Sequence, residues 1–137
     1  MSFVDKMKRQ ARDFGNVLVL PESKEERTLK AARIIMDEKL VSRLILVGNK
    51  TEVENEAEKI GVKLTGIDIV EPKTSPLFEK AVSTYYEKRK AKGLTKEQAI
   101  EEVVTDLGFA AMLVALGEAD AMVAGAQNTT ADVFIVS

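Results

Sequence analysis

Four short apolar runs, separated by segments with helical spacing, constrain the fold of this chain more than any other feature of the sequence. The runs are 16–20 (NVLVL), 43–47 (RLILV), 67–70 (IDIV) and 119–124 (ADAMVA). Apolar runs of this length predict strands that are buried on both faces of a sheet. Strands that alternate with helices pair in parallel through right-handed crossovers. The sequence therefore predicts an α/β fold with a mostly parallel sheet.

The segments between these runs carry apolar residues at spacings of three and four, which predicts amphipathic helices. We expect helices over 2–14, 29–40, 75–92 and 107–116, the last of them buried. Two further helices are predicted from capping boxes, one formed by Thr51 with Glu54 and one by Thr95 with Gln98. Gly93 is expected to end the basic segment 88–92.

Composition excludes several classes of function. The chain has 137 residues, a length that predicts one domain, and a net charge of −2, which gives no general attraction to nucleic acid or membranes. It contains no Cys and no His, so triad hydrolysis, thiolate chemistry and zinc catalysis are poor hypotheses, and no metal site is predicted. The lack of Cys and of an apolar run of about 18 residues fits a cytoplasmic location.

Two polar loops follow predicted strands and are candidate ligand sites, since ligands bind at the carboxyl ends of strands in open α/β sheets. One loop is 21–27 (PESKEER) and the other is 125–132 (GAQNTTAD). In the second, Asn128, Thr129 and Thr130 offer donors that suit phosphate oxygens or a carbonyl. A loop that merely caps and turns the chain explains the same residues equally well, because no phosphate-loop or dinucleotide fingerprint is present.

The segment 117–132 (GEADAMVAGAQNTTAD) resembles the signature G-E-x-D-[GA]-x-V-S-G-A-x-H-T-T-A-D of the phosphate acetyltransferases and phosphate butyryltransferases. The matching residues are Gly117, Glu118, Asp120, Val123, Gly125, Ala126, Thr129, Thr130, Ala131 and Asp132. Two other segments are also similar to the family, 20–32 (L-P-E-x-x-[DE]-x-R-T-L-x-A-A) and 86–93 (Y-x-x-[RK]-[RK]-x-K-G). The sequence departs from the signature at Ala124 and Asn128, where the family often has serine and histidine, and after Asp132.

The resemblance covers about residues 3–132 and only the N-terminal portion of a family subunit. It implies a three-layer α/β/α fold similar to isocitrate and isopropylmalate dehydrogenases, with the active site in a cleft between two domains. Residues 1–137 would then form a single, incomplete α/β domain. The serine, the aspartate and the arginine that family mechanisms use beyond this segment have no counterparts here, and Ile135 stands at the place of the arginine. No catalytic residue is therefore assigned.

The function implied by the resemblance is that of a phosphate acetyltransferase, an enzyme of acetate metabolism. The family moves an acetyl group between coenzyme A and inorganic phosphate to give acetyl phosphate, with coenzyme A as a substrate and no bound cofactor. Arg89 is implied as a coenzyme A ligand, although a solvated helix end explains a basic segment equally simply. Arg27 is implied to have a site-facing or structural role. Glu22 and Asp132 are interpreted as caps or hydrogen-bonding residues rather than bases, so the chain alone is expected to be inactive.

Three functional classes fit the resemblance. The chain could be a truncated acetyltransferase, a phosphate butyryltransferase, or a non-catalytic α/β binding or assembly module that kept the fold. Residues 133–136 (VFIV) form an apolar run at what would be an open sheet edge, a template for pairing with another chain. We therefore expect self-association, most simply as a homodimer.

Overall fold

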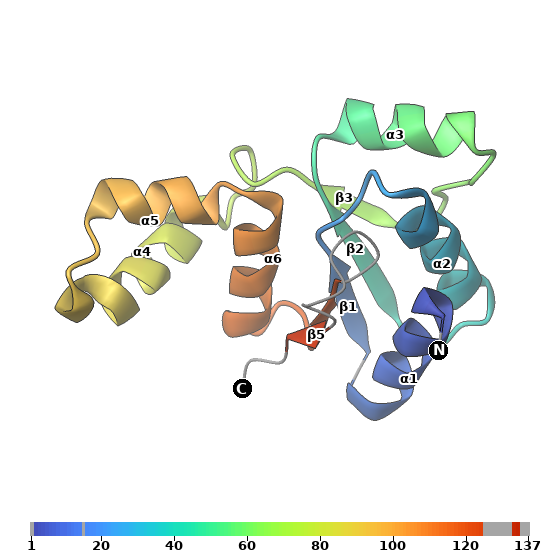
Figure 1. The fold of residues 1–137 in the computed structure, drawn as a ribbon, viewed down its shortest axis with the longest axis horizontal. Coiled ribbons are helices and arrows are strands. Elements are labelled where there is room, and N and C mark those ends of the chain that lie inside the picture. Colours follow the sequence, from blue (N-terminus) through green and yellow to red (C-terminus); the bar gives the residue numbers. More distant parts are fainter. Residues whose placement is uncertain (1, 15, 125–132, 135–137) are drawn as a thin grey trace.

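The structure, a computed structural model, describes residues 2–14, 16–124 and 133–134 and contains a sheet with strand order β3-β2-β1-β4-β5 (Figure 1). The first four strands pair in parallel, and β5 pairs antiparallel with β4. The strands are β1 (Val17–Leu20), β2 (Arg43–Val47), β3 (Asp68–Val70), β4 (Ala121–Val123) and β5 (Val133–Phe134). The predicted mostly parallel sheet is confirmed.

Helices cover both faces of this sheet and produce the predicted three layers (Figure 1). On one face lie α1 (Phe3–Phe14), α2 (Glu26–Asp37) and α3 (Lys50–Lys59). On the other lies α6 (Asp106–Ala115), preceded in the chain by α4 (Phe78–Arg89), the short 3-10 helix η1 (Lys90–Lys92) and α5 (Lys96–Val103). None of the helices in the described part of the chain is long and apolar enough to span a membrane.

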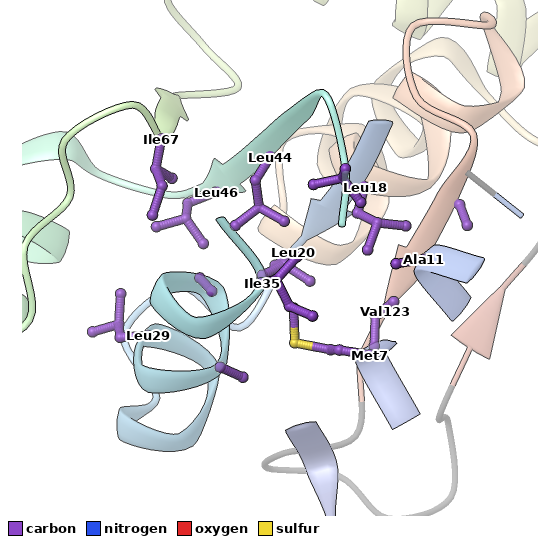
Figure 2. Close-up of a cluster of buried hydrophobic side chains, with 14 of the residues drawn as sticks. Met7, Ala11, Leu18, Leu20, Leu29, Ile35, Leu44, Leu46, Ile67 and Val123 are labelled. Atoms are coloured by element: carbon purple, nitrogen blue, oxygen red, sulfur yellow. The ribbon is translucent and has the colours of Figure 1, made fainter. Parts of the chain in front are cut away.

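Alternate residues of the central strands point to opposite faces, as the twofold period of a strand requires. Leu18, Leu20, Leu44 and Leu46 pack with Met7, Leu29 and Ile35 in the cluster shown in Figure 2. Val19, Ile45 and Val47 pack on the opposite face with residues of α6. These strands are apolar in nearly every position because both of their faces are buried.

The structure corrects two of the predicted helix starts. Asn49, not Thr51, caps α3, and its side chain accepts the N–H of Glu52 at 3.0 Å. The helix predicted from residue 75 begins at Phe78, because Pro76 disfavours helical geometry at Ser75 and a turn precedes the helix. The capping box at Thr95 and Gln98 is confirmed, with hydrogen bonds of 2.9 and 3.1 Å.

A helical arm, formed by α4, η1 and α5 (residues 78–103), projects away from the sheet and packs on α6 (Figure 1). Its buried residues Ala81, Val82, Ala99 and Val103 belong to the same cluster as Phe109 of α6. Gly108 is required where α5 meets α6, since a Cβ there would lie 1.9 Å from the carbonyl oxygen of Glu102. The arm is therefore joined to the body by a very close helix contact.

Candidate functional site

The strand order creates a topological switch point between β1 and β4, the place where ligands bind in open α/β sheets. From β1 the sheet extends through β2 to β3 on one side, whereas β4 lies on the other side of β1. The two polar loops singled out in the sequence follow these two strands. Asn128, Thr129, Thr130 and Asp132 lie outside the described residues, so their predicted roles stay predictions.

The loop after β1 is held in place by Ser23, a residue that the sequence analysis passed over. Its side chain is 2% exposed, and its Oγ donates a hydrogen bond to the carbonyl oxygen of Val47 at 2.7 Å. A Cβ on Gly48 would lie 2.3 Å from that Oγ, so the glycine after β2 makes room for the serine. The loops after β1 and β2 therefore form one packed edge.

Charged residues from three elements meet at this carboxyl edge. Lys24 of the loop forms an ion pair with Glu52 of α3 at 3.2 Å. Burial raises the pKa of Asp106, the first residue of α6, and the nearby Lys24 opposes this shift while Glu52 adds to it. A carboxyl group with a raised pKa at the carboxyl edge of the sheet is a candidate functional group. An acidic residue at a helix N-terminus also has a structural explanation, because it interacts favourably with the helix dipole.

Arg27 lies at this edge, as expected, because it is the second residue of α2 and α2 begins directly after the loop. Its side chain is 61% exposed, and its Nε lies 3.3 Å from Oε1 of Glu25. The next residue, Thr28, is fully buried, and its hydroxyl oxygen has no hydrogen-bond partner among the described residues. Arg27 is therefore accessible to a ligand.

Arg89 lies elsewhere, at the C-terminal end of α4 on the helical arm. Its side chain is exposed, and its guanidinium carbon lies over the ring of Tyr85, 5.3 Å from the ring centroid. Within the described residues Arg89 forms no ion pair, whereas its neighbour Lys90 pairs with Glu87 at 2.6 Å. The arm and α2 stand on opposite sides of α6 in Figure 1, so the two candidate arginines are not brought together.

The geometry of the described residues singles out no acid–base group. The carbonyl oxygen of Glu22 accepts the N–H of Glu25 at 3.1 Å in a turn. This bond involves the backbone, so the role predicted for the Glu22 carboxylate stays a prediction. Across the residues that the structure describes, no group of three acidic side chains could hold a metal ion. The carboxyl edge of the sheet therefore presents a packed loop, a helix N-terminus and exposed cationic side chains to a ligand.

Comparison with known proteins identifies the family of this chain. The family model described as "Phosphate acetyl/butaryl transferase" matches residues 2–135. The chain belongs to this family. It is 43% identical over 133 residues to the phosphate acetyltransferase of Treponema pallidum (strain Nichols), a match that covers 97% of this chain and 40% of that protein. It is 39% identical to the phosphate acetyltransferase of Thermoanaerobacterium thermosaccharolyticum over 96% of this chain and 39% of that protein.

Solved structures agree with the sequence comparison. The EutD phosphotransacetylase from Staphylococcus aureus superposes with a TM-score of 0.77 and 32% identity over 93% of this chain and 38% of that one. A phosphotransacetylase from Streptococcus pyogenes gives the same TM-score and identity over 96% of this chain and 40% of that one. The predicted family and fold are confirmed, and the chain spans about 40% of the length of the relatives it matches.

Proposed function

We propose that this chain takes part in the transfer of an acetyl group between coenzyme A and inorganic phosphate, in the cytoplasm. The observation that carries the proposal is the similarity, over 97% of the chain, to a phosphate acetyltransferase. The switch point between β1 and β4 supports it, since ligands bind at such a point, outside the carboxyl ends of the strands, in open α/β sheets. The acetyl reading is preferred to the butyryl one because the relatives compared above are named as acetyltransferases.

The reaction defines what the site must supply. An oxygen of phosphate attacks the carbonyl carbon of the thioester, the carbon–sulfur bond breaks, and coenzyme A leaves as a thiolate that takes up a proton. Cationic groups and N–H donors must neutralise the phosphate and the developing oxyanion. An acid–base group must handle the proton of the thiol.

Arg89 is the residue that we propose to bind a phosphate group of coenzyme A. Its guanidinium group is exposed and, within the described residues, not engaged in an ion pair. A guanidinium group binds phosphate through two parallel hydrogen bonds, which an ammonium group cannot match. Lys88 and Lys92 lie close to it in the sequence and add positive charge to the same end of the arm.

Arg27 and the segment containing Asn128, Thr129 and Thr130 are proposed to contact inorganic phosphate or the acyl group at the switch point. Arg27 is exposed at the start of α2, where the N-cap residue Glu25 does not cap the helix with its side chain. Free N–H groups at a helix N-terminus favour an anion. The carboxylate of Glu25 opposes this effect, so we expect the contribution of Arg27 to be smaller than that of Arg89.

Titration calorimetry with coenzyme A tests the assignment of Arg89. Arg89→Ala should weaken binding by about 1.5–3 kcal/mol, the usual scale of a hydrogen bond to a charged group. Wild-type binding should also weaken as salt rises, because phosphate contacts are screened. Arg12→Ala is the matched control, since Arg12 is also an exposed arginine in the last turn of a helix. Equal affinities for Arg89→Ala and wild type would contradict the assignment.

Activity is tested separately by following acetyl phosphate formation from acetyl coenzyme A and phosphate. We expect the 137-residue chain to bind coenzyme A without measurable turnover, because its residues supply binding groups and no assignable base. Clear turnover above the blank would contradict the expected inactivity and support the proposed reaction. A chain that neither binds coenzyme A nor turns over would favour the non-catalytic module.

A further inference from the structure

Tyr85 and Arg89 form a stacked pair on one face of α4. They are four residues apart, so their side chains lie above one another on the helix surface. The guanidinium carbon of Arg89 lies over the ring, 5.3 Å from its centroid. At this distance the negative face of an aromatic ring attracts a cation. Arg89 is thus held against a ring at the exposed C-terminal end of α4.

The ring is itself held by a second helix. The hydroxyl of Tyr85 donates a hydrogen bond to Oε2 of Glu102 in α5. This hydrogen bond, together with burial, raises the pKa of Tyr85, so the hydroxyl stays protonated and able to donate. Tyr85 and Glu102 also line one hollow with Leu107 and Met112 of α6. The ring of Tyr85 therefore lies where α4 and α5 of the arm meet α6.

This arrangement has two consequences for an arginine that must bind an anion. A free arginine side chain loses about 2 kcal/mol of rotamer entropy when it is fixed, and a ring that restricts it beforehand reduces that loss. The guanidinium group lies over the ring and forms no ion pair among the described residues, so its N–H donors remain available for a phosphate group. In addition, the tyrosine hydroxyl donates to the carboxylate of Glu102, an anion on the neighbouring helix, and we expect this bond to keep the carboxylate from competing with phosphate for Arg89.

We propose that Tyr85 is a positioning residue: its ring holds the guanidinium group of Arg89 ready for a phosphate group, and Glu102 holds the ring. This inference rests on the proposed function, in which Arg89 binds coenzyme A. Tyr85 is not among the residues that carry the family resemblance, which names Tyr86 instead. Tyr86 is half-buried on the same helix and packs with the α6 cluster, whereas the ring beneath Arg89 is that of Tyr85.

A double-mutant cycle with coenzyme A as the titrant separates positioning from a general effect on folding. Tyr85→Leu should weaken binding about three- to fivefold, the range expected for an exposed cation–π contact. In the Arg89→Ala background the same change should cause no further loss of coenzyme A affinity, because the guanidinium group that the ring positions is absent. Tyr86→Leu removes a ring of the same size and should leave the affinity unchanged. Equal losses from Tyr85→Leu in both backgrounds would overturn the proposal.

A second pair of variants tests the role of Glu102. Tyr85→Phe keeps the ring but releases the carboxylate of Glu102, so it should weaken coenzyme A binding. Adding Glu102→Gln should restore the affinity, because the neutral amide no longer competes for Arg89. Failure of Glu102→Gln to restore binding in the Tyr85→Phe background would overturn the part assigned to Glu102.

Nuclear magnetic resonance tests the contact between Tyr85 and Arg89 even if the wild-type protein does not bind coenzyme A. The Nε–H resonance of Arg89 should be shifted by the ring of Tyr85 in the ligand-free chain. Tyr85→Leu should move it to the position of a free arginine, and Tyr86→Leu should not. An Arg89 resonance that is unchanged in Tyr85→Leu would overturn the positioning role. If the chain does not bind coenzyme A but the Arg89 resonance is shifted, the result contradicts the proposed function and supports the contact between Tyr85 and Arg89.

Discussion

The carboxylate of Asp120 accepts a hydrogen bond from the backbone N–H of Val17 at 2.9 Å and a second from that of Asn16 at 3.0 Å. The N–H of Asp120 in turn donates to the carbonyl oxygen of Val17 at 2.9 Å. These bonds join the chain at the amino ends of β1 and β4, the edge of the sheet opposite the candidate site. This residue of the family signature therefore has a structural role, which is to set β4 beside β1.

Replacing Asp120 should lower stability rather than affect ligand binding directly. Asp120→Ala removes two hydrogen bonds to a charged acceptor, each with a typical contribution of about 1.5–3 kcal/mol. Because the residue is exposed, we expect the total loss in the free energy of unfolding to lie near the lower value. Asp120→Asn should lose less, since its amide oxygen still accepts. Urea denaturation followed by circular dichroism checks this, with Asp13→Ala as an exposed control; equal stabilities for Asp120→Ala and wild type would contradict it.

Gly48 should tolerate no side chain while Ser23 is present. A Cβ at position 48 would lie 2.3 Å from Oγ of Ser23, and overpacking of this kind costs about 1–3 kcal/mol. In Ser23→Ala/Gly48→Ala the clashing oxygen is absent, so the double variant should be more stable than the sum of the single changes predicts. Chemical denaturation of the four proteins measures this coupling. Additive losses would mean that the two loops do not share the packed edge described above.

Asp106 should make stability depend on pH in a defined direction. Its pKa is raised above the ordinary value of 3.8, so the folded state disfavours the ionised form. The resulting penalty is absent below the ordinary pKa, develops as pH rises through the window just above it, and is complete above the raised value. Asp106→Asn should therefore gain stability relative to wild type as pH rises through that window. A stability difference that stays constant from about pH 3 to about pH 7 would contradict this account.

We expect the chain to self-associate, most simply as a twofold dimer. The side of β3 away from β2 is a sheet edge in the described structure, and Ile100 of the arm and Leu107 of α6 are 42% and 50% exposed. Open edges and exposed apolar side chains favour association. Light scattering during size-exclusion chromatography at low micromolar concentration measures the mass. Leu107→Lys should shift it toward the monomer more than Ile34→Lys on α2, whereas a monomeric wild-type chain would refute the expectation.

Much of the fold was predictable because its strands are buried on both faces. The bounds predicted for β2 are those observed, and β1 begins one residue later than predicted. The start of α3 was missed because Asn49 and Thr51 are both good caps. The correctly predicted end of β2 does not choose between them. In the structure Asn49 accepts the N–H of Glu52, and the N–H of Lys50 donates to the carboxylate of Glu71 at 2.8 Å, a contact between segments that has no local sequence pattern.

The candidate site was less predictable than the fold. The position of Arg27 followed from the order of strand, loop and helix, which is local information. The raised pKa of Asp106 depends on burial against elements far away in the sequence. The helical spacing of Tyr85 and Arg89 was a usable signal, whereas the contact from Tyr85 to Glu102 joins two helices and has no local sequence pattern.

Under the proposed function, in which Arg89 binds coenzyme A, the close contact at Gly108 sets a requirement on the length of the ligand. Because α5 is pressed against α6 there, the helical arm holds its end at a set span from the carboxyl ends of β1 and β4. A molecule anchored at both places must be as long as that span. We therefore expect a short acyl thioester without a nucleotide to reach only one of the two proposed contact places.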